Sequence, residues 1–301
     1  MKLWKSKRRV GSVIVRPNRL LWAVSELRGD RWTLSDGGRW DSEPHVGPQP
    51  DDLRELWIRH QAEWGLVVPC AARVGLFALP PLAENEIARG LQWQCEKAFG
   101  ISSADPAIDY ERLPTGRPLV YQGRSAAQCN ALVVALEKPA LEPWIDWASR
   151  LPYPPMRLEP TLPAFHRAVT TMPPYGSDDG TLWIYSDAGQ VLLITTVAGQ
   201  SLAVRELGPA VGCGSDPLTQ PGLPRLQELL LHCEDRLPEL RFRHLVTFGD
   251  LDFESVSILG QTLGLEPTRV TAPTIQWPES LAAPEDWVLL YGNLLETGRH
   301  E

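Results

Sequence analysis

The chain has 301 residues, of which 43% are hydrophobic and 22% are charged, and its formal net charge at pH 7 is −8. That apolar content can fill one large domain or two lobes, and the acidic balance argues against nucleic acid as the main partner, because phosphate binding needs a basic face. No apolar run reaches the roughly 18 to 20 residues that span a bilayer, which argues against a membrane-spanning protein.

Hydrophobic periodicity in the first half of the chain predicts a three-stranded meander followed by alternating helices and strands. The expected strands are Val10–Val15, Leu20–Leu27, Arg31–Ser35, Arg73–Leu79 and Ile108–Leu113. We expect Asp36-Gly37-Gly38 to close the third strand as a turn. Helices are expected from about Asp51 to Trp64 and from about Leu82 to Phe99, where Gly100 ends the second one.

The rest of the chain continues the alternation of predicted strands and helices. Ala131–Leu136 is nearly all apolar, which is typical of a strand covered on both faces. The other expected strands are Met156–Glu159, Thr181–Ser186, Val191–Val197, Ser201–Leu207, Leu245–Phe248 and Thr268–Val270. The expected helices are Pro139–Arg150, Leu162–Thr171, Leu223–Leu237, Glu254–Leu263 and Trp287–Leu295.

Both halves therefore run strand-strand-strand-helix-strand-helix, although their residues are not repeated. Such a duplication indicates an α/β protein of two lobes, each a mixed sheet flanked by helices. This is the duplicated ribonuclease-H-like, actin-like fold found in actin, Hsp70 and the sugar kinases. A two-domain Rossmann-type protein is the alternative, but it would begin with parallel strands. We place the first lobe at 1–172, with an inserted subdomain around 80–130, and the second at 173–301.

The pattern of cysteines and histidines argues against a metal site and against a secreted protein. The five cysteines form no C-x-x-C pair, and the six histidines include no H-E-x-x-H motif. We therefore expect no metal, unpaired thiols and a cytoplasmic location. A basic cluster near the start is either a solvated tail or a contact for anionic lipid or an acidic partner. Its members are Lys2, Lys5, Lys7, Arg8 and Arg9.

Tryptophan is unusually frequent, with twelve residues. Those on predicted helices are Trp57, Trp64, Trp93, Trp144 and Trp147. Most of them are expected in the core, and a few are expected as exposed contacts for partners, because tryptophan is favoured at interfaces.

Four segments, in order along most of the chain, carry a family resemblance. The first runs from Leu79-Pro80 through the helix to the Asp-Tyr strand at 108–113, and the second is the apolar strand that ends at Lys138. Glu159-Pro160 through Ala168 is the third, and the closing helix with Tyr291–Leu295 is the fourth. Together they resemble the PilM, MshI and GspL group, the actin-like assembly proteins of type IV pili and type II secretion.

The resemblance implies where a nucleotide would bind. Actin-like ATPases wrap the phosphates with two glycine-containing hairpin turns, hold magnesium through an Asp at each turn, and pack a Gly-Gly turn against the adenosine. The first turn should lie within Ile14–Leu20, which contains neither glycine nor an acid. Arg16 and Asn18 are therefore degenerate nucleotide-loop positions, at which Arg16 could attract phosphate but could not hold magnesium.

The other two turns keep part of the pattern. Asp187 and Gly189 preserve Asp-x-Gly, as a remnant of a magnesium-linked loop or as an ordinary hairpin turn. At the adenosine turn Gly249 is present, but Asp250 replaces the second glycine and would bring bulk and negative charge towards the nucleotide.

These changes predict a pseudo-ATPase with no catalytic residue, no metal and no required cofactor, while weak binding of ATP with magnesium is left open. By resemblance, the chain is a cytoplasmic scaffold, peripheral to the inner membrane, of an MSHA-like type IV pilus or a type II secretion platform. Its expected partners are the cytoplasmic tail of a PilN-like bitopic membrane protein and the assembly ATPase. The alternative is an active actin-like ATPase or a sugar-kinase-type phosphotransferase.

Overall fold

A computed structural model describes residues 8–17, 19–28, 31–41, 49–70, 72–79, 84–101, 106–113, 120–121, 124–125, 130–172, 179–187, 190–207, 222–237, 240–249, 251, 253–268 and 287–297. The chain divides into two compact units. Unit 1 comprises Met1–Ala71, Pro139–Ala168 and Ala272–Glu301, and unit 2 comprises Ala72–Lys138 and Val169–Thr271. The units interleave along the chain, whereas the sequence suggests successive lobes at 1–172 and 173–301.

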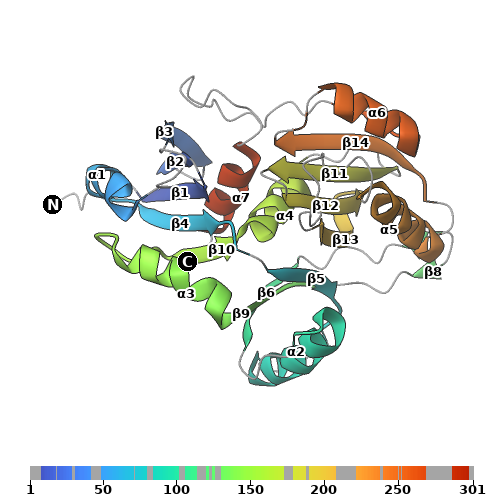
Figure 1. The fold of residues 1–301 in the computed structure, drawn as a ribbon, viewed down its shortest axis with the longest axis horizontal. Coiled ribbons are helices and arrows are strands. Elements are labelled where there is room, and N and C mark those ends of the chain that lie inside the picture. The colour runs from blue at the N-terminus through green and yellow to red at the C-terminus, as the bar shows by residue number, and fades with distance from the viewer. Residues whose placement is uncertain are drawn as a thin grey trace. The chain divides into compact units, whose positions relative to one another are not determined.

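Unit 1 is built on a mixed five-stranded sheet with the order β10-β4-β1-β2-β3 (Figure 1). Its strands are β1 (Arg9–Arg16), β2 (Arg19–Arg28), β3 (Arg31–Asp41), β4 (Glu63–Val68) and β10 (Arg157–Pro160). The first three form an antiparallel meander, and β4 and β10 add parallel strands at the β1 side. The central strand β1 is almost entirely buried, because it lies between β2 and β4 in the sheet.

Helices cover both faces of this sheet. Gly11 and Ser12 are consecutive in β1, so their side-chain positions point to opposite faces. On one face the Trp64 ring lies directly over Gly11 and stacks on Trp57 of α1 (Pro50–His60), with ring centroids 4.3 Å apart. On the other face Asn293 of α7 (Trp287–Thr297) donates a hydrogen bond from Nδ2 to Ser12 Oγ at 2.9 Å. Each face is thus closed by one of the two helices.

Helix α7 explains why the end of the chain belongs to unit 1. It packs against β1, β2 and β4 and is buried on nearly all sides, as its apolar sequence requires. Two further helices belong mostly to this unit. They are α3 (Lys138–Ser149), apart from Lys138, and α4 (Thr161–Thr171) up to Ala168.

Two local predictions in unit 1 are wrong. The predicted turn at Asp36-Gly37-Gly38 is part of β3, because the register shift between Val24 and Ser25 absorbs an extra residue as a bulge and the strand continues. The predicted helix to Trp64 ends at His60. Gln61 has a positive φ of 48° and donates from its backbone N to the Trp57 carbonyl, which ends the helix so that β4 can start.

Two members of the basic cluster are tied to the sheet of unit 1. Arg8 pairs with Glu63 at 3.1 Å, and Arg9 pairs with Glu26 at 2.7 Å and donates to the His60 carbonyl. Lys2, Lys5 and Lys7 lie outside the described residues.

Unit 2 repeats the sheet of unit 1, with the order β13-β12-β11-β14-β15. Its strands are β11 (Gly180–Asp187), β12 (Gln190–Val197), β13 (Gln200–Leu207), β14 (Phe242–Gly249) and β15 (Glu266–Pro267). The first three again form an antiparallel meander, followed by two parallel strands. This duplication confirms the predicted fold class. The predicted strand at Thr268–Val270 is replaced by β15, and residues 269 and 270 lie outside the described part.

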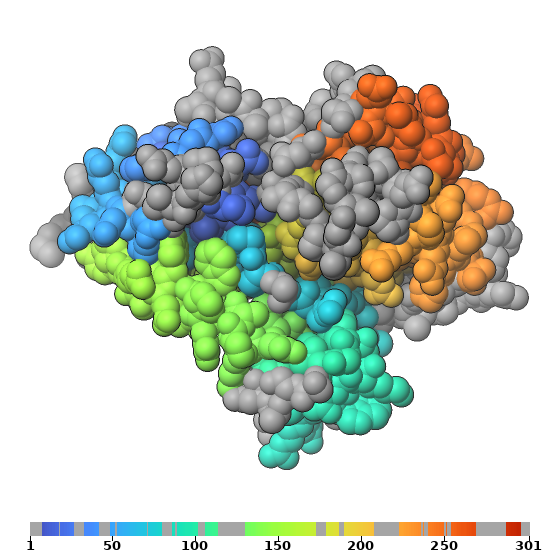
Figure 2. Space-filling view, in the orientation of Figure 1, coloured from blue at the N-terminus to red at the C-terminus, as the bar shows by residue number. Residues whose placement is uncertain are grey.

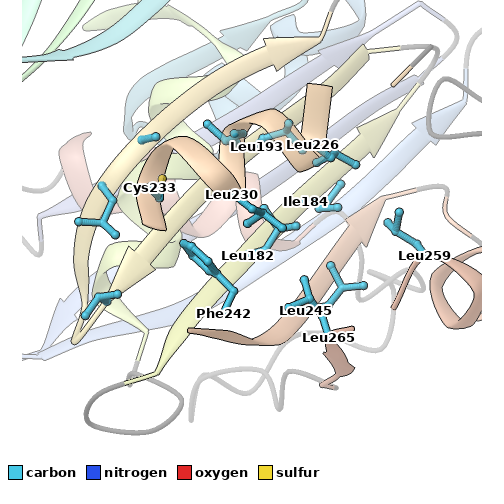
Figure 3. Close-up of a cluster of buried hydrophobic side chains, with 14 of the residues drawn as sticks. Leu182, Ile184, Leu193, Leu226, Leu230, Cys233, Phe242, Leu245, Leu259 and Leu265 are labelled. Atoms are coloured by element: carbon cyan, nitrogen blue, oxygen red, sulfur yellow. The ribbon is translucent and has the colours of Figure 1, made fainter. Parts of the chain in front are cut away.

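Helices α5 (Gly222–Arg236) and α6 (Phe253–Leu263) pack their apolar stripes against this second sheet. Figure 3 shows the resulting core, in which Leu226, Leu230 and Cys233 of α5 meet Leu182 and Ile184 of β11. The helix α6 is ended by Gly264, whose φ of +67° is the left-handed conformation that favours glycine.

A smaller antiparallel sheet with the order β5-β9-β6 completes unit 2. It consists of β5 (Arg73–Phe77), β6 (Pro106–Arg112) and β9 (Ala131–Glu137), and β7 (Val120–Tyr121) pairs with β8 (Arg124–Ser125) nearby in sequence. Helix α2 (Glu84–Phe99) packs its apolar stripe on this sheet. The segment predicted as an inserted subdomain, around 80–130, contributes α2 and β6.

Candidate functional site

The first predicted nucleotide turn is a tight hairpin in unit 1. Arg16 of β1 pairs with Arg19 of β2, so only Pro17 and Asn18 remain to form the turn. The side chain of Arg16 is only 3% exposed, and Pro17 has no backbone N–H to offer to a phosphate. Asn18 lies outside the described residues. Pro17, the described residue of this turn, therefore brings no backbone donor to a ligand.

The second predicted turn, in unit 2, has the same length. Asp187 at the end of β11 pairs with Gln190 at the start of β12, and the two residues between them, including Gly189, lie outside the described part. The preceding residue, Ser186, pairs with Gly249 of β14. The fold thus brings two predicted positions, Asp187 and Gly249, to neighbouring strands at one end of the unit 2 sheet. Asp250 is not among the described residues.

Gly249 is required by the backbone itself. Its φ is +89°, and a Cβ at this position would lie 1.8 Å from the Ser186 carbonyl oxygen. Both a left-handed conformation and a close approach to the next strand therefore demand glycine. The glycine expected from the adenosine turn has a structural role here that needs no nucleotide.

We expect Gly249→Ala to lower the free energy of unfolding by about 3 kcal/mol, the sum of left-handed strain and overpacking against Ser186. Gly264→Ala is the matched control, because its φ is +67° but a Cβ there meets nothing within 4 Å. The control should cost about 1 kcal/mol from strain alone. Urea denaturation measures both, and equal losses would contradict the close approach.

A buried polar network holds unit 1 together. Glu159 is 3% exposed and forms an ion pair with Arg167, which is 2% exposed, and Arg157 Nε donates to the same carboxylate at 2.9 Å. Arg167 also donates from Nε to the Gly292 carbonyl at 3.0 Å. The neighbouring His166 is fully buried, and this burial, with Arg167, lowers its pKa to about 3, so it stays neutral. The network joins the consecutive elements β10 and α4 to helix α7, which lies more than a hundred residues further along the chain.

The same segments meet at a close helix crossing. A Cβ at Gly292 of α7 would lie 1.8 Å from the Ala164 carbonyl oxygen of α4, so only glycine allows these two backbones to touch. Glu159, Arg167 and Gly292 all belong to segments that carry the family resemblance. Their contacts show that these segments build the core of unit 1. Their residue types are visible in the sequence, but their meeting is not.

Unit 2 also carries a surface groove that the sequence gives no sign of. It lies between the β12–β13 strands and α5 and has a volume of about 750 Å³. Its charged lining consists of Arg205, Glu206, Arg225, Glu228 and Asp235. Burial raises the pKa of Glu206, although a hydrogen bond from Gln190 opposes the shift. Because its lining carries both signs of charge, the groove does not define a ligand.

Neither a metal centre nor a reactive thiol emerges from the described parts of the chain. No group of three or more His, Cys, Asp or Glu side chains among them could hold a metal ion. Cys95 is buried, and this burial raises the pKa of its thiol to about 11, which makes it a poor nucleophile. Within the described ranges no helix has both the length and the apolar character needed to cross a bilayer.

Comparison with known proteins gives matches only at the level of structure. No protein-family model and no curated protein matches the chain. The chain is similar to a solved PilM-PilN type IV pilus biogenesis complex, with a TM-score of 0.66 and 16% identity over 96% of this chain and 98% of that one. It is also similar to a Bacteroides thetaiotaomicron protein with an actin-like ATPase fold and unknown function, with a TM-score of 0.52 and 11% identity over 90% and 93% of the two chains.

These likenesses, with the duplicated sheets, define the class: the chain has the actin-like ATPase fold. Within that class its architecture is PilM-like, since the likeness to the PilM-PilN structure extends over nearly the whole of both chains. The predicted fold and the predicted resemblance are thereby confirmed.

Proposed function

We propose that this chain is a scaffold of a type IV pilus assembly platform that holds the cytoplasmic tail of a PilN-like membrane protein. The observation that carries this proposal is the full-length likeness to the PilM-PilN type IV pilus biogenesis complex. The proposed location is the cytoplasmic face of the inner membrane, with the tail as the link to the membrane and the assembly ATPase as a second partner. An MSHA-like pilus is the proposed system, and a type II secretion platform is the alternative.

Two features support binding rather than catalysis. The residues that carry the family resemblance, such as Glu159, Arg167 and Gly292, are engaged in packing unit 1. The two hairpins that would wrap a phosphate are closed by Arg16–Arg19 and Asp187–Gln190 pairs, which leaves two turn residues in each. Phosphate-binding loops need several convergent backbone N–H groups, more than such turns supply.

The partner proposal is tested with the full chain and a synthetic peptide. The peptide is the cytoplasmic tail of the bitopic membrane protein encoded beside the gene, and a scrambled peptide of the same composition is the control. We expect saturable binding of the native tail by fluorescence anisotropy, with at least tenfold weaker binding of the scrambled one. Equal binding of the two peptides, or none, would overturn the proposal.

Titration of the chain with ATP and magnesium is expected to give no binding heat at micromolar concentrations. The first turn offers no acid to hold magnesium-bound water, and the turn length limits phosphate contacts at both hairpins. Isothermal calorimetry measures this directly. Micromolar binding would contradict the pseudo-ATPase proposal, and its loss in Asp187→Asn would then assign magnesium binding to the second turn.

A further inference from the structure

Helix α2 has two contrasting faces. One face is buried against the small sheet of unit 2 and consists of Ile87, Leu91 and Cys95. The opposite face is exposed and carries Glu86, Gly90, Trp93 and Lys97. These four residues follow the spacing i, i+4, i+7 and i+11, which places them in one narrow stripe along the helix. In the space-filling view the teal atoms of this segment lie at the surface (Figure 2).

Trp93 and Gly90 of this stripe have no role in packing among the residues that the structure describes. Trp93 is 63% exposed, although tryptophan is among the most buried residue types on average. Lys97 holds its ammonium 5.4 Å from the centroid of the Trp93 ring, which steadies the ring in this exposed position. Gly90 weakens the middle of a helix, yet a Cβ there would meet nothing within 4 Å. Gly90 therefore leaves an open space on the helix surface beside the exposed Trp93 ring.

We propose that this stripe pairs with the same stripe of a second copy of the chain, across a two-fold axis with the two α2 helices antiparallel. If the two-fold axis passes level with the midpoint between Leu91 and Gln92, Trp93 of each copy lies opposite Gly90 of the other. The same axis sets Glu86 opposite Lys97. A two-fold contact needs a patch that is complementary to itself, and this stripe has that property in both shape and charge.

The charges beside the stripe agree with this arrangement. Arg89 and Glu96 are exposed on the same flank of α2, and antiparallel pairing brings Arg89 of one copy near Glu96 of the other. Because acids and bases are balanced, the surface is not suited to a strongly charged peptide or an anionic membrane. The tryptophan supplies the apolar anchor that such contacts require. The balance of positive and negative charges on this surface thus favours a second copy of the chain as the binding partner.

A contact limited to one helix face is small, so the expected dimer is weak and depends on concentration. Sedimentation velocity on the full chain, from low micromolar to several hundred micromolar, should show a monomer–dimer equilibrium. Gly90→Leu fills this open space with no internal clash and should weaken the dimer at least tenfold while leaving the fold intact. Gln92→Leu adds the same side chain off the stripe, on an exposed position of the same helix, and should leave the dimer unchanged.

Charge reversal gives an independent test. Arg89→Glu should weaken the dimer, because it faces Glu96 of the second copy with a like charge, and the double variant Arg89→Glu with Glu96→Arg should restore it. A chain that stays monomeric at several hundred micromolar overturns the proposal. A dimer that is equally strong in Gly90→Leu, or one that the double variant fails to restore, overturns it as well. The result does not depend on tail binding by the same chain.

Discussion

Replacing Gly292 by alanine is expected to lower the thermal midpoint of unfolding by roughly 6 to 12 °C. The new Cβ would lie 1.8 Å from the Ala164 carbonyl oxygen, a backbone atom that no side-chain rotation can move. Helices α4 and α7 must separate to relieve the clash, at a cost of about 3 kcal/mol or more. For a domain of this size, each kcal/mol changes the midpoint by about 2–4 °C.

The higher helix propensity of alanine would by itself raise the thermal midpoint. The sign of the measured change therefore shows whether the clash or the propensity dominates. Alanine is favoured over glycine inside a helix by about 1 kcal/mol. Gly90→Ala, in the exposed stripe of α2, is the matched control, because there the substitution changes the helix propensity and causes no clash. It should raise the midpoint by about 1 to 4 °C. Circular dichroism on both variants settles the matter, and a stabilised Gly292→Ala would show that the two helices do not touch as described.

Much of the fold can be predicted from the sequence because strands and helices impose short periods on the apolar residues. The helical pattern predicts one apolar stripe of Ile87, Leu91, Cys95 and Ala98, of which the first three are buried and Ala98 is exposed. The pattern misplaces Trp64 because a residue seven positions after Trp57 fits a helical stripe. The same two rings also stack when one lies on α1 and the other on β4. Periodicity does not distinguish these two cases.

The candidate site is less predictable because its requirements arise between segments. The places of Asp187 and Gly249 follow from their positions after strands, so the sequence locates them. The need for glycine at 249 comes from the Ser186 carbonyl on the neighbouring strand, which no local pattern contains. Trp93 shows the same limit. Its helix was predictable, but its exposure depends on which face the small sheet covers.

Removing the buried guanidinium of Arg167 is expected to be the most damaging single change of charge. Arg167→Met leaves the Glu159 carboxylate, 3% exposed, without its buried partner and removes the side-chain hydrogen bond to the Gly292 carbonyl. Breaking one side of a buried ion pair typically costs about 3–5 kcal/mol. Because Arg157 still donates to Glu159 at 2.9 Å, we expect the lower half of that range, measured by urea denaturation.

Two further variants separate burial from charge. Arg39→Met breaks an ion pair with Asp41, 2.7 Å long, whose side chains are 38% and 63% exposed. This surface control should change the free energy of unfolding by no more than about 1 kcal/mol. Adding Glu159→Gln to Arg167→Met removes the stranded charge and should recover part of the loss. If the double variant is no more stable than Arg167→Met, the cost lies in the lost hydrogen bond to Gly292 rather than in the buried carboxylate. The contact between α4 and α7 would then depend on the hydrogen bond from Arg167 as much as on the absence of a side chain at Gly292.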